Sequence, residues 1–169
     1  LLACSDPGGT SDPDASVDDV LLEQILEDSV DQVILPTYQQ LAENAETLLS
    51  MVQDLHTDPQ LEAAPEHWRL TRVYWEQSEA VLFGPVADQG LDPALDSWPV
   101  DRVQLDQVLR SGIALTPETI ASDLGGGLKG FHPIEYLLFG DGGSMTAAEL
   151  VADPRQQEYL LAAIEVLRN

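Results

Sequence analysis

Apolar residues recur at alternating four- and three-residue steps along the first half of the chain. One series runs through Leu41, Ala45, Leu48, Val52 and Leu55. These steps follow one face of an α-helix. No useful length of sequence alternates apolar and polar residues, which is the pattern of a half-buried strand. The sequence therefore predicts an all-α fold, built as a helical bundle.

Proline and glycine residues mark where the predicted helices begin and end. The first helical segment, 17–54, contains Pro36, and because proline lacks an amide hydrogen we expect a kink or break near Leu35. A second helix is expected to begin around Pro59 and to end at residues 83–85, which read Phe-Gly-Pro. The other expected elements are a connection without a clear period at 84–99, short helices at 100–111 and from Thr116 to the glycines at 125–127, a capping box at 146–149, and a last helix from 153 to 169.

Two stripes of side chains run along the second helix. Arg72 and Glu76 lie four residues apart on one of them, and we interpret them as an exposed ion pair, which contributes roughly a few tenths of a kcal/mol. Glu79 follows on the same stripe, between Trp75 and the apolar residues 81–83, so we expect it to be partly buried. The other stripe is apolar, is expected to face the core, and consists of Leu61, Ala64, Trp68, Thr71, Trp75 and Leu82.

The charge balance restricts the classes of partner. Thirty acidic residues against seven basic ones give a formal net charge of -23 over 169 residues. Such a chain repels the phosphate backbone of nucleic acids, which excludes nucleic acid as a partner. The acidic residues are scattered through the helical segments, so they indicate a solvated acidic surface. With 44% hydrophobic residues, the chain can still bury one domain-sized core.

The first residues predict attachment to a membrane. Leu1-Leu2-Ala3-Cys4 matches the end of a bacterial lipoprotein signal, in which a small residue precedes a cysteine that becomes lipidated. The alternative is that Cys4 is a free thiol, since no second cysteine is present to form a disulfide. Residues 5–16 are rich in Ser, Asp, Gly and Pro and are expected to form a flexible tether before a helical domain at 17–169.

The apolar stretch 130–140 contains the candidate functional residues. His132 precedes Glu135 by three residues, which places both side chains on one face if the stretch is helical. An imidazole nitrogen and a carboxylate oxygen together suit iron, zinc or manganese. The alternative is that Pro133 is the first residue of the helix, His132 its N-cap, and Glu135 a capping residue at the third position. The spacing alone leaves both interpretations open.

Three stretches, taken together and in this order, carry a family resemblance. They are Tyr-Trp-Glu-Gln-Ser-Glu-Ala-Val-Leu-Phe-Gly-Pro at 74–85, Leu-Asp-Ser-Trp-Pro-Val-Asp at 95–101, and Lys-Gly-Phe-His-Pro-Ile-Glu-Tyr at 129–136. The chain resembles the imelysin family of bacterial exported proteins over residues 17–169. The family signature Gly-x-His-x-x-Glu is present as Gly130, His132 and Glu135.

The resemblance implies an architecture and a location. Members of the family look like two helical bundles in tandem, and this chain resembles the N-terminal half of them. Glu79 matches an acidic position of the second helix, while Asp96, Trp98 and Gly130 match motif positions with a structural role. Related proteins include iron-regulated surface proteins and periplasmic components of iron uptake. We therefore expect a protein of the bacterial cell envelope, anchored by lipid on the periplasmic side of the outer membrane.

Three functions are compatible with these residues. The first is binding of a metal ion, most simply iron with zinc as the alternative. Its ligands would be His132, Glu135 and a facing Glu79 or Glu76. Such a protein would act in iron acquisition, with a transport partner in the envelope. The second is a zinc metallopeptidase, as the family was once named, but such a site needs about three ligands and a general base. The third is an interaction module without metal, in which His132 and Glu135 only shape a cleft.

Overall fold

The computed structural model describes residues 16–140, 142–143 and 145–169, and every regular element in these ranges is a helix. The predicted all-α fold is thus confirmed. None of the described helices is both long and apolar enough to cross a lipid bilayer. Cys4 and the tether residues 5–15 lie outside the described ranges, so the predicted lipid anchor stays a prediction. The chain divides into two units, Leu1–Pro36 and Thr37–Asn169, and each is described by itself.

In the first unit, the described residues form one interrupted helix. Helix α1 (Val17–Ser29) begins at Ser16, whose hydroxyl accepts the N–H of Asp19 in a capping box. The π-helical turn η1 (Val30–Ile34) follows and ends where α2 begins. There the N–H of Leu35 donates to the carbonyl of Val30, five residues earlier. This turn is the interruption that Pro36 predicts near Leu35, because a residue without an N–H cannot continue the regular hydrogen-bond ladder.

The second unit contains most of the helices. The longest are α2 (Leu35–Gln53), of which residues 37–53 belong to this unit, α3 (Asp58–Ser78) and α9 (Pro154–Arg168). The shorter elements between α3 and α9 are η2 (Glu79–Val81), α4 (Pro85–Asp88), α5 (Leu91–Leu95), α6 (Arg102–Arg110), η3 (Thr119–Asp123), η4 (Gly126–Leu128), α7 (Phe131–Phe139) and α8 (Ala147–Ala152).

The predicted apolar faces form the core of this unit. The buried residues of α2 are Leu41, Ala45, Leu48, Leu49 and Val52. The predicted stripe of the second helix is confirmed along α3, since Leu61, Ala64, Trp68, Thr71 and Trp75 are all buried, and Leu82 beyond the helix end is partly buried. Each large aliphatic or aromatic side chain that is removed from water in this way contributes about 1.5–3 kcal/mol to folding.

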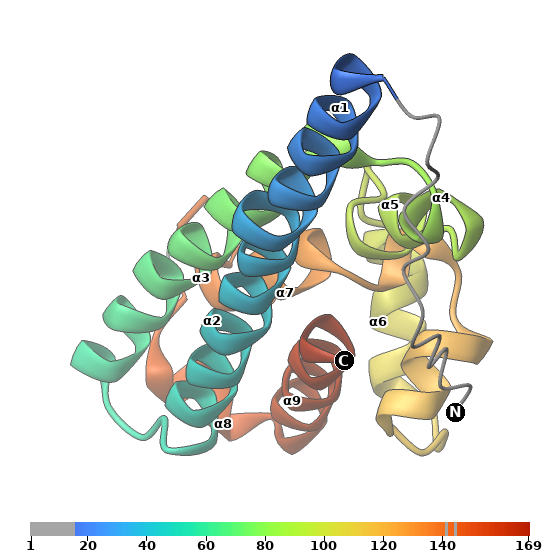
Figure 1. Cartoon of the computed structure of the whole chain (residues 1–169). Helices are drawn as coiled ribbons and strands as arrows, with labels where there is room; N and C mark the ends of the chain where they lie inside the picture. The colour runs from blue at the N-terminus through green and yellow to red at the C-terminus, as the bar shows by residue number, and fades with distance from the viewer. Residues whose placement is uncertain (1–15, 141, 144) are drawn as a thin grey trace. The chain divides into compact units, whose positions relative to one another are not determined.

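Helix α7 is packed between α3 and α9 (Figure 1). On the α3 side, the Trp68 indole N–H donates to the carbonyl of Phe131 over 3.2 Å, and the two rings meet edge to face. On the α9 side, the buried Tyr159 hydroxyl donates to the carbonyl of Leu128, just before α7. These contacts fix the start of α7 and hence the direction of the side chains that follow.

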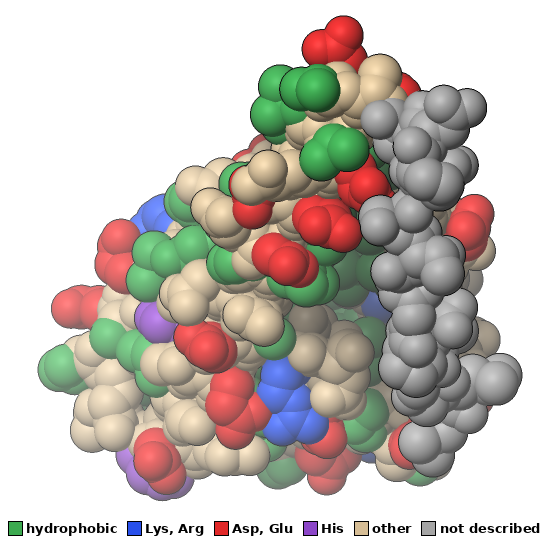
Figure 2. All heavy atoms as spheres, in the orientation of Figure 1, with side chains coloured by type: hydrophobic (Ala, Val, Ile, Leu, Met, Phe, Trp, Pro, Cys, Tyr) green, Lys and Arg blue, Asp and Glu red, His purple; other side chains and the backbone are tan. Residues whose placement is uncertain are grey.

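Several predicted boundaries are confirmed. Thr146 and Glu149 form the predicted capping box of α8, and Asp153 caps α9 with Pro154 as its first residue. Acidic side chains are spread over the visible face rather than gathered in one patch (Figure 2). This distribution agrees with the solvated acidic surface that the composition indicates.

Two short segments differ from their predictions. The connection 84–99 contains α4 and α5, because Pro85 and Pro93 both lie in first helical turns, where the missing N–H costs no helical hydrogen bond. After Thr116, which caps the segment by accepting the N–H of Thr119, the chain forms the π-helical turn η3 rather than a regular helix. The glycines that were expected only to end this helix instead lead into the 3₁₀ turn η4.

The capping interpretation of the histidine motif is wrong. Helix α7 begins at Phe131, two residues before Pro133, and its N-cap is Gly130. His132 is therefore the second helical residue, and Pro133 is the third, a position whose N–H has no helical acceptor. Both ring nitrogens of His132 contact carboxylates rather than backbone at the helix start.

Candidate functional site

Gly130 brings the start of α7 against the end of α5 (Leu91–Leu95). Its φ is +83°, a conformation that residues with a β-carbon rarely adopt, and an added β-carbon would overlap the backbone of Leu95. Only glycine therefore allows this close approach. As a result Asp96, the residue after Leu95, lies beside His132.

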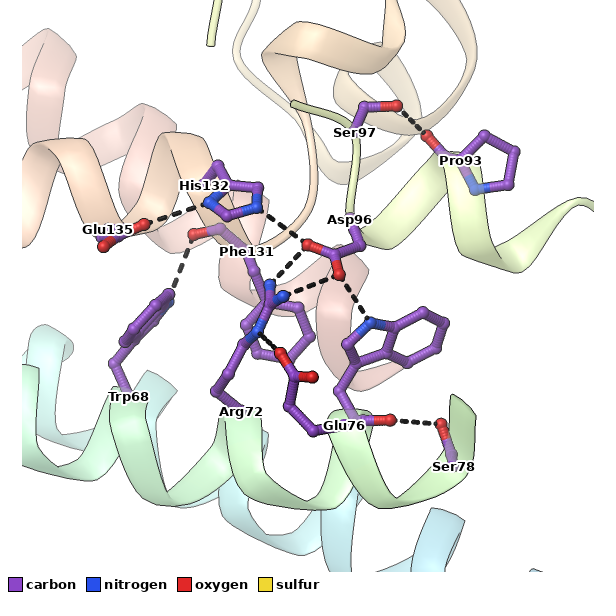
Figure 3. A network of polar contacts seen from close by, with 11 residues as sticks. Trp68, Arg72, Glu76, Ser78, Pro93, Asp96, Ser97, Phe131, His132 and Glu135 are labelled. Atoms are coloured by element: carbon purple, nitrogen blue, oxygen red, sulfur yellow. Dashed lines mark hydrogen bonds and ion pairs between the residues drawn. The ribbon is translucent and has the colours of Figure 1, made fainter. Parts of the chain in front are cut away.

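His132 lies between two carboxylates (Figure 3). Its Nε2 is 2.8 Å from Oδ1 of Asp96, and its Nδ1 is 3.1 Å from Oε2 of Glu135. The side chains of His132 and Asp96 are 17% and 12% exposed, whereas that of Glu135 is 39% exposed. The imidazole and Asp96 are thus largely enclosed, while Glu135 faces solvent.

Asp96 is held in place by three further donors. Arg72 donates to both carboxylate oxygens, with 2.7 Å between its Nη2 and Oδ2, and the Trp75 indole N–H donates to Oδ2 over 3.1 Å. Burial by itself raises the pKa of Asp96, but the hydrogen bonds from Arg72 and Trp75 and the positive charge of Arg72 outweigh it, so the pKa lies below its usual value. Asp96 is therefore an ionised group that can only accept hydrogen bonds.

The fixed carboxylate of Asp96 determines which ring nitrogen of His132 carries a hydrogen. Because Asp96 only accepts, Nε2 of His132 must carry a hydrogen and donate it. Nδ1 then points at Oε2 of Glu135, which is also an acceptor, so a cation must lie between the two atoms: a proton or a metal ion. Neighbouring ligand atoms that bind one metal at about 2.1 Å and at right angles lie about 3 Å apart. The 3.1 Å separation of Nδ1 and Oε2 matches this value.

The other two predicted ligands belong to a second group. Oxygens of Glu76, Glu79 and Asp96 lie within 4.8 Å of one another, but His132 and Glu135 are outside this group. Glu79 is exposed rather than partly buried, because α3 ends at Ser78 and the turn η2 begins with Glu79. Asp96 belongs to this second group and also contacts His132.

Arg72 is not the exposed residue that the sequence predicts. It does pair with Glu76 over 2.7 Å, but its side chain is only 18% exposed and its guanidinium also binds Asp96. No local sequence pattern predicts the contact between Arg72 and Asp96, because Asp96 follows Arg72 by 24 residues. It also precedes His132 by 36 residues. In the sequence, the contact between Asp96 and His132 is indicated only by the family resemblance, in which the motif at 95–101 occurs together with the motif at 129–136.

The two other histidines lie apart from this site. His56 is exposed, and His67 contacts the carbonyl oxygen of Asn44 through Nε2 at 3.0 Å. Neither residue contacts His132 or Glu135.

A cavity of about 430 Å³ opens beside the pair of His132 and Glu135. Its walls are mostly apolar and include three aromatic side chains, Trp98, Tyr136 and Phe139, together with Arg102, His132 and Glu135. The Trp98 ring meets the imidazole edge on, with 4.8 Å between the ring centroids. The site therefore combines an imidazole and a carboxylate with an open, largely apolar space.

Comparison with known proteins places the chain among iron-regulated relatives. The Imelysin family model matches residues 34–169. Iron-regulated protein A of Synechococcus elongatus is 37% identical over 146 residues, which are 85% of this chain and 37% of that protein. This chain thus spans well under half of that relative.

Two crystal structures share the fold. A protein named as an iron-regulated protein A precursor, from Parabacteroides distasonis, is 31% identical with a TM-score of 0.75, over 92% of this chain and 44% of the other. An Imelysin-like protein from Psychrobacter arcticum is 20% identical with a TM-score of 0.69, over 86% of this chain and 46% of the other. With the family model matching most of its length, this chain belongs to the Imelysin family.

Proposed function

We propose that this chain binds an iron ion between Nδ1 of His132 and Oε2 of Glu135. The observation that carries the proposal is the series of contacts from Asp96 to His132 to Glu135, in which an anchored carboxylate holds Nε2 and turns Nδ1 toward a second carboxylate. Metal-binding histidines commonly donate their other ring N–H to a carboxylate in this way. An imidazole nitrogen with a carboxylate oxygen is a donor set that suits iron.

Asp96 acts in this proposal as a positioning residue rather than as a ligand. Its oxygens already accept hydrogen bonds from Arg72, Trp75 and His132. Glu76 is likewise paired with Arg72, through Oε1, so both carboxylates already neutralise a guanidinium that a bound metal would repel. Water or a further ligand fills the remaining coordination positions.

The names of the relatives and the first residues of the chain support a proposal for the wider role. Relatives named iron-regulated protein A support a role connected with iron. We propose that the protein works in the bacterial cell envelope, held on the periplasmic side of the outer membrane by lipid on Cys4, and that it passes iron to a transport partner there. The net charge of -23 would raise the local concentration of cations around the domain.

Peptide hydrolysis is less well supported by the geometry. A zinc peptidase needs about three protein ligands, an open position for water and a general base. The described residues bring one histidine and Glu135 together, and the nearest other carboxylate, Asp96, is engaged by Arg72. In a metal-free interaction module a proton would lie between Nδ1 of His132 and Oε2 of Glu135, and the two side chains would only hydrogen-bond each other beside the cavity.

The test is calorimetric titration of the chain with ferrous iron without oxygen, and with zinc in parallel. His132→Ala and Glu135→Gln should each weaken iron binding by at least about tenfold, because each removes one donor atom. His56→Ala is the matched control, since it removes an exposed histidine outside the site and should leave the affinity unchanged. Unchanged iron affinity in His132→Ala, with a normal circular dichroism spectrum, would remove His132 from the site. Peptide cleavage abolished by Glu135→Gln would favour the peptidase instead.

A further inference from the structure

We infer that the iron arrives as a complex with a planar aromatic chelator of the catechol class, and that the chelator lies in the cavity beside His132 and Glu135. This inference rests on the proposed iron site and adds the chemical form of the ligand. It is carried by three features of the cavity: its size, the aromatic side chains among its lining residues, and a lining side chain with a positive charge.

The cavity is larger than a hydrated ion requires. A six-coordinate iron ion held by His132 and Glu135 has four positions left, and four water molecules occupy about 120 Å³ at ~30 Å³ each. The cavity measures about 430 Å³, which leaves most of its volume unused by these waters. That volume lies in the range of pockets that bind small organic molecules.

Trp98 presents an aromatic surface to this space. Its side chain is 69% exposed, although an indole of this size is normally well covered in a folded protein. Its ring meets the imidazole of His132 edge on, with 4.8 Å between the centroids. Tyr136 and Phe139 line the same cavity from α7. Aromatic walls of this kind favour a flat ring, which packs against them face or edge on.

Arg102 gives the cavity a positive side chain. Its guanidinium lies over the Tyr136 ring, with 4.7 Å between its central carbon and the ring centroid. In a chain with a net charge of -23, a positive group beside a candidate metal site is unexpected for the capture of a bare cation. It suits a chelator with an electron-rich ring and negative iron-bound phenolate oxygens, because a guanidinium interacts favourably with aromatic faces and with such oxygens.

The coordination arithmetic agrees with this ligand class. A catechol binds iron through two adjacent oxygens, so two such chelators fill the four positions that His132 and Glu135 leave open, and one chelator fills two of them and leaves two for water. A complex with three chelators has all six positions filled and would have to release one of them to bind. Its larger negative charge would also be repelled by the acidic surface. We therefore expect the complexes with one or two chelators to bind, and the complex with three to bind poorly.

The test compares two probes, ferrous iron alone and the 1:1 ferric complex of catechol, by equilibrium dialysis. Catechol without metal is the third arm. The wild-type chain should bind the ferric complex. Its affinity for metal-free catechol should be at least tenfold lower. Trp98→Ala should lose at least tenfold more affinity for the complex than for ferrous iron, and Trp98→Phe should recover most of the loss. Phe83→Ala removes another exposed aromatic side chain outside the cavity and is the matched control.

The outcomes separate this inference from the proposed iron site. If Trp98→Ala binds the complex as tightly as wild type, the inference is wrong, while ferrous binding that depends on His132 would leave the iron site standing. If His132→Ala keeps full affinity for both probes, the iron site and the inference fall together. Metal-free catechol that binds as well as the complex would also overturn the inference, because coordination would then contribute nothing.

Discussion

The substitution Asp96→Asn tests how the site is held together. Asparagine keeps the size and one carbonyl acceptor of Asp96, but it removes the negative charge that faces Arg72 and His132. Ion pairs at the surface contribute about 0–1 kcal/mol, and breaking a buried pair costs about 3–5 kcal/mol. With side chains 12% and 18% exposed, the pair of Asp96 and Arg72 lies between these limits. We expect Asp96→Asn to lower the free energy of unfolding by about 2–3 kcal/mol at pH 7.

The effect of this substitution should depend on pH. The pKa of Asp96 is lowered in the folded protein, so its stabilising contribution is complete above the unfolded value of about 3.9 and is lost as the pH falls through the lower folded value. Urea unfolding of wild type and Asp96→Asn should therefore differ most at pH 7 and progressively less below about pH 4. Other carboxylates titrate in both proteins, and their effect cancels in the difference. A difference below about 0.5 kcal/mol at pH 7, which is typical of an ordinary surface position, would refute the reasoning.

Two further substitutions test the supports of the site. Gly130→Ala places a β-carbon against the Leu95 backbone at φ +83°. It should destabilise the fold by about 1–3 kcal/mol and should also weaken iron binding. A melting temperature within a degree of wild type would contradict this. Gly142→Ala is its control, since Gly142 has a similar φ of +76° but open space around it, so the difference between the two variants measures the overlap with Leu95. Tyr159→Phe removes the hydroxyl that donates to the Leu128 carbonyl and should cost about 1 kcal/mol in urea unfolding. Burial also raises the pKa of Tyr159, so in wild type this phenol should remain protonated when the exposed tyrosines ionise in an alkaline absorbance titration.

The parts of the fold that depend on the spacing of apolar residues and on helix-capping residues were predictable from the sequence. The buried stripe from Leu61 to Trp75 is a local pattern, and Thr146 and Asp153 are local start signals, so each could be read without knowing what the helix packs against. The short helices α4 and α5 carry no period long enough to detect. The start of α7 was predicted at the wrong residue because Pro133 is compatible with either the first or the third helical position, and only the packing of Gly130 on Leu95 decides between them.

The candidate site was predictable only in part. The three-residue spacing of His132 and Glu135 predicts that the two side chains meet, and they do. The carboxylate that holds the other side of the imidazole comes from a separate segment, and so does the arginine that holds this carboxylate. Contacts between segments depend on the tertiary fold, for which one sequence carries no spacing rule. Glu79 was expected to be partly buried because apolar residues surround it, but the end of α3 turns it outward.

The most direct measurement is the position of iron in crystals of this chain, located by anomalous diffraction at the iron absorption edge after soaking with ferrous iron without oxygen. The account predicts one peak within bonding distance of both Nδ1 of His132 and Oε2 of Glu135, with Nε2 still on Asp96. The same soak of His132→Ala should give no peak there. A peak among Glu76, Glu79 and Asp96, with His132 and Glu135 still joined to each other, would contradict it.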